Sequence, residues 1–264
     1  MSLLAISSPA AAGGDHGHRI VCEIAFRLAE PETRAEIRRL LREDPKHDFF
    51  SDSCLWADKP FKRRDKEHYV NFPRNTTKVT SLACPPGDPC ILEAIASDLK
   101  KLADKSQLDE VRLDALKFLG HWIGDLHQPL HVSLKGDSGG NDIEVTGVAC
   151  DEMHGLWDTC LVAASVKEDV REAAKELIAT ITPLMQEQWV QSEVHHWASE
   201  SLKVTREPTT KYCILQAGTA FCSQPSGQVH IDTAYVNDHK AIIRERLAKA
   251  GVRLAHLLNQ ALSN

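Results

Sequence analysis

The sequence contains no Cys-x-x-Cys pair, although eight of its 264 residues are cysteines. Structural zinc sites of the finger type use such pairs, so their absence argues against that class. Three pairs of cysteines instead bracket short segments: Cys84 and Cys90, Cys150 and Cys160, and Cys213 and Cys222. Cys22 and Cys54 have no near neighbour. An even number of cysteines favours disulfides in an oxidising compartment, and therefore a secreted or periplasmic protein.

The sequence also lacks an excess of positive charge, since 31 Lys and Arg face 37 Asp and Glu, for a net charge of −6. Proteins that hold nucleic acid through basic patches need Lys and Arg to neutralise phosphates. If the substrate is a polyanion, the positive charge must come from elsewhere. Bound divalent metal is one source, because it is often the largest local charge in a site.

Long hydrophobic runs are missing as well, and after residue 12 no segment approaches the roughly 20 apolar residues of a membrane span. The first twelve residues hold a short apolar patch, Leu3 to Ile6, and end in three alanines, Ala10 to Ala12. We interpret 1–12 as a signal remnant or a disordered segment. Residues 13–264 are then expected to form one domain.

What the sequence does contain is helical periodicity. Helices are expected over 18–29, 31–42, 90–104, 108–127, 153–165, 168–181, 183–203 and 231–262. Only 67–72 and 142–146 look extended. The sequence therefore predicts a mostly α, single-domain helical bundle with a small extended or hairpin segment.

Histidine and aspartate recur in matched pairs. His121 and Asp125 are four residues apart, and so are His154 and Asp158, with a Trp inside each pair. On a helix this spacing brings the two Cβ atoms to roughly 5–6 Å, where imidazole and carboxylate can share a metal ion. A single such pair is usually a surface hydrogen bond. Two pairs strengthen the metal hypothesis.

Several strings resemble those of the S1/P1 nuclease family, which is related in fold to the zinc phospholipases C. The most specific is HWIGDLHQPLH, from His121 to His131. The others, in the order of the family, are Gly17-His18-Arg19, Trp56-Ala57-Asp58, His68 to Pro73 (HYVNFP), Gly139-Gly140-Asn141 and His154 to Thr159 (HGLWDT). The resemblance runs from about residue 17 to 159, and the final helices fit only by their general character.

The resemblance implies three zinc ions. The first would be held by Asp58, His68, His121 and Asp125, and the second by His131, His154 and Asp158. The third would be held by His18, by Asp125 as a bridging ligand, and by the backbone of a processed N-terminal residue. The family begins its mature chain with Trp, whereas Gly13 stands at that position here. The third ion therefore depends on cleavage near Gly13.

Two further positions differ from the family pattern. Phe61 stands where the family often has a Lys, and Glu152 where it has an Asn. Both positions concern the placing of substrate and not the metal ligands.

The implied activity is zinc-dependent endonucleolytic hydrolysis of single-stranded DNA and RNA to 5′-phosphorylated products, with 3′-nucleotidase activity. Zinc supplies hydroxide near neutral pH and neutralises phosphate. The catalytic carboxylates would be Asp58, which orients the attacking water, and Asp125. The resemblance implies that Tyr69 stacks on a base. Asn71 could then form a hydrogen bond with the edge of that base. Tyr69 could equally be a core aromatic.

Asn141 could belong to a mere turn, but we favour substrate contact. The substrates would be single-stranded nucleic acid and nucleotides, with no stable membrane association and a monomeric protein. Two other functions stay open: a zinc phospholipase C, and a secreted protein in which zinc only stabilises the fold. Oxygen and nitrogen ligands without cysteine favour a catalytic zinc site over a structural one.

Overall fold

The computed structural model describes residues 13–263, so the predicted signal remnant at 1–12 lies outside the described residues. The described chain is mostly helical, as predicted, and contains three two-stranded sheets. The helices are α1 (Gly13–Leu28), α2 (Pro31–Leu41), α3 (Phe50–Ser53), α4 (Ile91–Ala103), α5 (Asp109–His127), α6 (Met153–Gly155), α7 (Leu161–Ser165), α8 (Val170–Ala179), α9 (Pro183–Val190), α10 (Val194–Thr205) and α11 (Thr233–Leu262).

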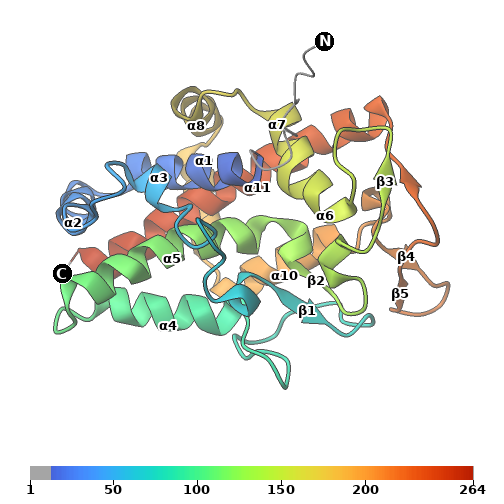
Figure 1. The fold of residues 1–264 in the computed structure, drawn as a ribbon, viewed down its shortest axis with the longest axis horizontal. Coiled ribbons are helices and arrows are strands. Elements are labelled where there is room, and N and C mark those ends of the chain that lie inside the picture. The colour runs from blue at the N-terminus through green and yellow to red at the C-terminus, as the bar shows by residue number, and fades with distance from the viewer. Residues whose placement is uncertain (1–12, 264) are drawn as a thin grey trace, which may run out of the picture.

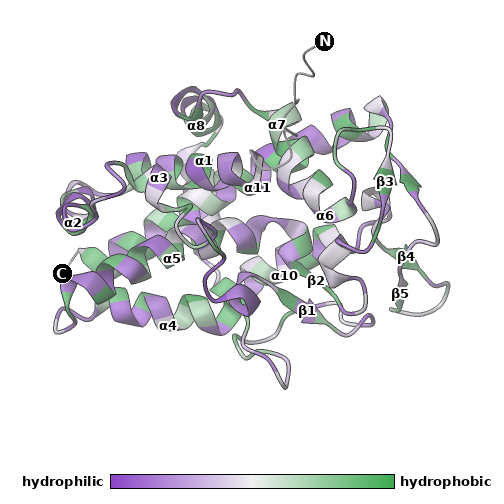
Figure 2. Cartoon of the chain, viewed as in Figure 1, coloured by the Kyte–Doolittle hydropathy of each residue, from purple (hydrophilic) through white to green (hydrophobic). Residues whose placement is uncertain are grey.

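Helix α5 lies near the middle of the bundle, with α1 on one side, α4 on another and α11 running behind them along the molecule (Figure 1). Its Trp122 and Ile123 are fully buried, which suits a helix with neighbours on several sides. Hydrophobic and hydrophilic residues alternate around α4 (Figure 2), as expected for a helix that buries one face. Pro129 follows the end of α5 at His127, as the sequence predicted.

Helices α1 and α11 approach each other closely at Gly251. A Cβ added there would lie 2.4 Å from Ile24 Cγ2, so only glycine fits without a shift. Helix α1 begins at Gly13 and not at His18 as expected, and its first turns contact other elements, since a Cβ added to Gly17 would lie 3.7 Å from Leu247. Gly13-Gly14 and Gly17 are poor helix formers, but tertiary contacts override local propensity.

Two expected helices are interrupted. The segment expected as one helix over 183–203 forms α9 and α10, separated by residues 191–193. The segment expected over 153–165 forms α6 and α7 with a π-helical turn, Leu156–Cys160, between them. Residues 191–193 contain no Pro or Gly, so periodicity alone could not locate that break. Gly155 ends α6 and is the one local signal for the second break.

The strands are short, and two of the three pairs join segments that are far apart in the sequence. Strand β1 (Val70–Phe72) pairs in parallel with β2 (Val132–Leu134), and β3 (Val145–Thr146) pairs in parallel with β6 (Val229–His230). Strand β4 (Ile214–Leu215) and β5 (Cys222–Ser223) form an antiparallel hairpin. The expected extended segment 67–72 begins as a 3₁₀ turn, Asp65–His68, before β1.

All eight cysteines form disulfides. The three pairs that bracket short segments are each joined, and Cys22 is joined to Cys54. The Cys22–Cys54 bond ties α1 to the end of α3. None of the helices in the described part of the chain has the length and apolar content that a bilayer crossing requires.

Candidate metal centre

The eight side chains predicted as metal ligands converge on one region. They come from six separate parts of the chain: His18 on α1, Asp58 after α3, His68 at the end of the 3₁₀ turn, His121 and Asp125 on α5, His131 before β2, and His154 and Asp158 around α6. Parallel pairing of β1 with β2 brings the segment after His68 beside the segment after His131.

Asp125 is the centre of this cluster and is 2% exposed. Its Oδ1 lies 3.2 Å from His18 Nε2 and 3.6 Å from His131 Nδ1. Its Oδ2 lies 3.1 Å from His68 Nδ1 and 3.3 Å from His121 Nε2. One carboxylate thus contacts four imidazoles, an arrangement that allows it to bridge two cations.

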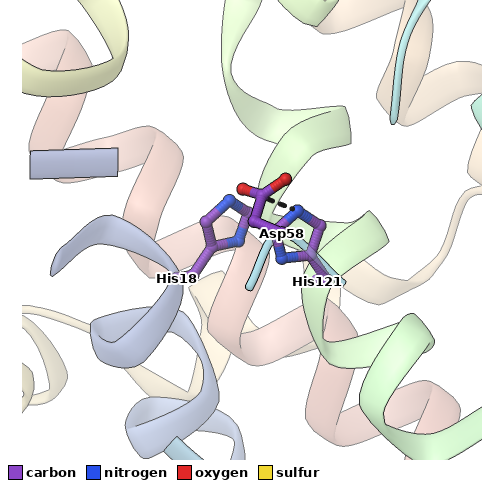
Figure 3. A group of neighbouring side chains, drawn as sticks. All are labelled: His18, Asp58 and His121. Carbon is purple, nitrogen blue, oxygen red and sulfur yellow. Dashed lines mark ion pairs between the residues drawn. The ribbon is translucent and has the colours of Figure 1, made fainter. Parts of the chain in front are cut away.

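The first group of possible ligands is His18, Asp58 and His121. Figure 3 shows the two imidazoles side by side with the carboxylate beside them. The ring centroids are 3.8 Å apart, and Asp58 Oδ2 lies 3.5 Å from His121 Nε2. Gly124 makes room for this stack, because a Cβ there would lie 2.5 Å from His18 Nδ1.

A second group shares His121 and consists of His68, His121 and Asp125. His68 Nδ1 and His121 Nε2 are 3.1 Å apart, and His68 Nδ1 is 3.6 Å from Asp58 Oδ1. Asp58 thus reaches both histidines of this group. These four side chains are the set that the family resemblance assigned to one ion.

The third group is His131, His154 and Asp158. His131 Nε2 lies 3.6 Å and His154 Nε2 lies 3.9 Å from the Asp158 carboxylate. The π-helical turn at Leu156–Cys160 carries Asp158, and such widened turns are frequent at functional sites. Gln128 Nε2 donates to Asp158 Oδ1 at 3.2 Å, and the Leu130 N–H donates to Gln128 Oε1. The side chain of Gln128, a residue to which the sequence assigned no role, therefore holds Asp158 beside the turn that carries His131.

In four of the histidines one ring N–H donates to a backbone carbonyl oxygen. The pairs are His121 Nδ1 with Cys54 at 2.8 Å, His131 Nδ1 with His68 at 2.7 Å, His154 Nδ1 with Gly139 at 2.9 Å, and His68 Nε2 with Arg63 at 3.0 Å. Such bonds fix the tautomer and the ring orientation of metal-binding histidines. The other nitrogen of each ring faces the carboxylates.

Two buried atoms of the first group have no hydrogen-bond partner among the described residues, His18 Nδ1 and Asp58 Oδ1. Buried polar atoms are normally satisfied, so unpaired ones need an explanation. A cation would satisfy the Asp58 oxygen. Together with the nitrogen and oxygen donors, this fits a metal centre.

The buried carboxylates and imidazoles of the cluster shift one another's pKa values. Burial opposes ionisation of Asp125, but the surrounding histidines hold its pKa well below the usual range. Burial likewise opposes protonation of His131, yet the Asp125 and Asp158 carboxylates raise its pKa to about 9. A cation that binds here must therefore displace protons, and its affinity should rise with pH.

The three predicted substrate contacts, Tyr69, Asn71 and Asn141, line one pocket of about 310 Å³. His131 and His154 line the same pocket, so it opens beside the third ligand group. Tyr69 is only partly buried, so it is not a fully enclosed core aromatic. Asn141 Nδ2 also bonds the Ser138 carbonyl oxygen at 2.6 Å, as the turn interpretation required.

The positions that depart from the family pattern have identifiable contacts. Phe61 is 65% exposed, whereas the adjacent Lys62 Nζ lies 3.8 Å from Asp58 Oδ1. Glu152 accepts a bond from the Gly155 N–H and caps α6. His127, which lies within the HWIGDLHQPLH string, is in none of the three ligand groups, and its Nε2 accepts a bond from Arg253 Nη1 at 2.9 Å.

Comparison with known proteins shows the family to which the chain belongs. The S1/P1 Nuclease family profile matches residues 14–263. The chain belongs to the S1/P1 nuclease family. It is 30% identical to Endonuclease 2 of Arabidopsis thaliana, over 94% of this chain and 89% of that protein. It is 26% identical to Nuclease S1 of Aspergillus oryzae, over 93% of this chain and 90% of that protein.

Nuclease P1 of Penicillium citrinum is 25% identical, over 94% of this chain and 97% of that protein. The match covers the final helices as well, which the motifs alone did not reach. Membership of the S1/P1 nuclease family makes the protein a hydrolase of phosphodiester bonds. The four disulfides fit an extracellular protein.

Proposed function

We propose that the protein is a zinc-dependent endonuclease that hydrolyses single-stranded DNA and RNA to 5′-phosphorylated products and also removes 3′-phosphates from nucleotides. The observation that carries this proposal is the convergence of three ligand groups around Asp125, beside a pocket lined by Tyr69 and Asn71. Imidazole and carboxylate donors without cysteine are the ligands of catalytic zinc sites.

The residues that would hold zinc follow the groups described above. Asp58, His68, His121 and Asp125 would hold one ion, and His131, His154 and Asp158 another. His18 and Asp125 would hold a third, together with the backbone of a processed N-terminus near Gly13. Zinc bound in such groups activates water and neutralises phosphate charge.

Side chains and backbone carbonyls of the protein position the attacking water and the metal-binding histidines. Asp58 is partly exposed, with its side chain at 29%, so one carboxylate oxygen can accept a hydrogen bond from the attacking water and orient it. Asp125 keeps its negative charge in the buried centre and holds the histidines around it. Backbone carbonyls keep the imidazoles in fixed orientations, so little reorganisation is needed when substrate arrives.

The Tyr69 pocket explains the expected preference for single strands. Stacking on an aromatic ring contributes roughly 1–3 kcal/mol per base and tolerates any sequence. A base must leave its stack to reach such a pocket, which costs a few kcal/mol in a duplex. We therefore expect duplex DNA to be a poor substrate.

The proposal includes a secreted or periplasmic location, because the four disulfides require an oxidising compartment. It also includes a monomeric state. Mass spectrometry of the protein recovered from its native compartment tests the N-terminus. A mature chain that starts near Gly13 supports the third ion, and an intact Met1 contradicts it.

The decisive experiment compares Asp125→Asn with Asp114→Asn. Both residues lie on α5, but Asp114 is about 16 Å away along the helix axis. We expect Asp125→Asn to lower cleavage of single-stranded DNA by more than about a hundredfold and to reduce zinc content by more than one ion. Asp114→Asn should change neither.

Single-stranded DNA, single-stranded RNA and phosphatidylcholine are tested in parallel, with and without EDTA. Zinc-dependent cutting of DNA or RNA supports the nuclease proposal. Release of a head group from phosphatidylcholine without nucleic acid cleavage would support a phospholipase C instead. Full activity of Asp125→Asn would contradict the assignment of the centre.

A further inference from the structure

A second, larger groove adjoins the Tyr69 pocket and has a volume of about 570 Å³. Tyr69, Asn71 and Ser138 line both spaces, so the two are direct neighbours. Ligand sites usually have volumes of about 300–1,000 Å³. The volume of the Tyr69 pocket, about 310 Å³, is near the lower end of that range. A polynucleotide with one base in this pocket must continue into a neighbouring space.

One wall of the groove is a rigid, proline-rich loop. Pro85, Pro86 and Pro89 line the groove, and the Cys84–Cys90 disulfide closes the loop on itself. The Ile91 N–H after the loop donates to the Tyr69 carbonyl oxygen at 3.2 Å. This bond holds the proline wall in a fixed position relative to the base pocket. Proline rings offer apolar faces against which a sugar or a base can pack.

Four charged residues line the groove, Lys66, Asp88, Lys135 and Asp142. Lys66 Nζ pairs with Asp88 Oδ1 at 2.5 Å, and Asp142 accepts a bond from Ser138 Oγ at 2.8 Å. Lys135 makes no ion pair within residues 13–263, and it is exposed. Its backbone N–H donates to the Phe72 carbonyl oxygen at 2.8 Å, which fixes it beside β1. An unpaired ammonium group thus faces the groove.

We propose that this groove is a second nucleotide subsite, which holds the nucleotide next to the one whose base enters the Tyr69 pocket. Lys135 lies against the phosphate of that nucleotide, and the proline wall packs against its sugar or base. Asp88 neutralises Lys66 in the same groove, so Lys135 is the lysine there without an ion pair among the described residues. The inference rests on the proposed function, because it extends the site along a single-stranded polynucleotide.

The test compares Lys135→Ala with Asp88→Asn, because the two changes alter the charge of the groove in opposite directions. For Lys135→Ala, the ratio of KM for oligothymidylate to KM for 3′-thymidylate should rise about three- to tenfold. Asp88→Asn frees Lys66 and should lower the same ratio. Lys105→Ala is the matched control, since this exposed lysine lies beyond the far end of α4.

A second readout does not depend on catalysis. Labelled phosphorothioate oligothymidylate, which resists cleavage, is titrated into the metal-loaded protein, and its anisotropy is followed at several salt concentrations. Lys135→Ala should weaken binding and reduce the slope of log K against log salt by about 0.7, the value for one phosphate contact with a single strand.

Equal effects of Lys135→Ala on oligonucleotide and mononucleotide would overturn the subsite, and so would no effect on either. If the wild-type protein cuts neither substrate, the proposed function fails, and anisotropy alone decides the subsite. Unchanged binding by Lys135→Ala, or no binding by the wild type, then overturns it. A loss in Lys135→Ala that affects the oligonucleotide more than the mononucleotide supports the subsite.

Discussion

At the scale of single residues, the position of His18 depends on the missing side chain of Gly124. The two residues come from α1 and α5, and their helices cross where the imidazole stacks on His121. The motif string contains this glycine, but its spacing says nothing about a partner from another helix. The ligands were therefore predictable from the sequence, whereas the reason that they fit together was not.

Gly124→Ala is expected to displace His18 and lower the zinc content of the protein. The added Cβ would meet His18 Nδ1 at 2.5 Å, well inside van der Waals contact. Alanine should otherwise stabilise α5 by up to about 1 kcal/mol through its helix propensity. Metal analysis and circular dichroism together separate these effects, since zinc should fall while helix content is kept.

Gly17→Ala on α1 is the matched control. Its Cβ would lie 3.7 Å from Leu247, an ordinary contact, so zinc content should stay at the wild-type level. Equal zinc content in Gly124→Ala and wild type would show that His18 does not depend on this close approach.

At the scale of elements, helices were predictable and their partners were not. Periodicity located most helices to within a few residues, and the structure shows Pro31 in the first turn of α2 and Thr182 as the cap of α9. Strand β2 was missed because three residues carry no periodic signal, and its partner β1 is about sixty positions earlier. Pairing of that kind is a tertiary contact, which no local pattern encodes.

Helices α10 and α11 are joined by a cluster of charges around Glu200. Its carboxylate lies 2.6 Å from Arg253 Nη2 and 3.0 Å from Arg246 Nη1. Burial would raise the pKa of Glu200, but the bond to Arg253 and the nearby cations lower it from 4.5 to about 2. The ionised form is therefore favoured in the folded protein.

This lowered pKa predicts how stability depends on pH. A carboxyl whose folded pKa is below its unfolded pKa stabilises the fold above the unfolded value and loses that contribution as pH falls. Glu200→Gln should therefore be less stable than wild type by about 1–2 kcal/mol near neutral pH, after allowance for solvent screening. The gap should close as pH falls from 4.5 towards 2.

Urea unfolding at a series of pH values measures this gap. Glu245→Gln on α11 is the control, because its partly exposed pair with Lys249 should contribute less than about 1 kcal/mol. A gap for Glu200→Gln that is independent of pH would contradict the stated cause.

At the scale of the whole molecule, disulfides join regions that the sequence could not pair with certainty. Cys22 and Cys54 are 32 residues apart and had no near neighbour to suggest their partners. Their bond ties α1, which carries His18, to the segment before Asp58. The Cys54 carbonyl oxygen also orients His121. This bond therefore supports the centre as well as the fold.

Removal of the Cys22–Cys54 bond by alanine substitution should lower the free energy of unfolding by about 3–4 kcal/mol, from the entropy of the closed loop. Removal of Cys84–Cys90, which closes a loop of only 6 residues, should cost about 2 kcal/mol. Denaturant unfolding in EDTA compares the two without a contribution from metal. The reverse order would show that loop entropy does not govern these bonds.

The close packing of α1 and α11 bears on how the protein is made. Helix α1 precedes α11 in the chain and is synthesised before it, yet the two lie against each other at Ile24 and Gly251. Helix α1, which carries His18, therefore gains its full support only after α11 has been synthesised. A metal ion that meets the growing chain before that point finds partial sets of donors. Loading of the centre accordingly follows the docking of α11 on α1.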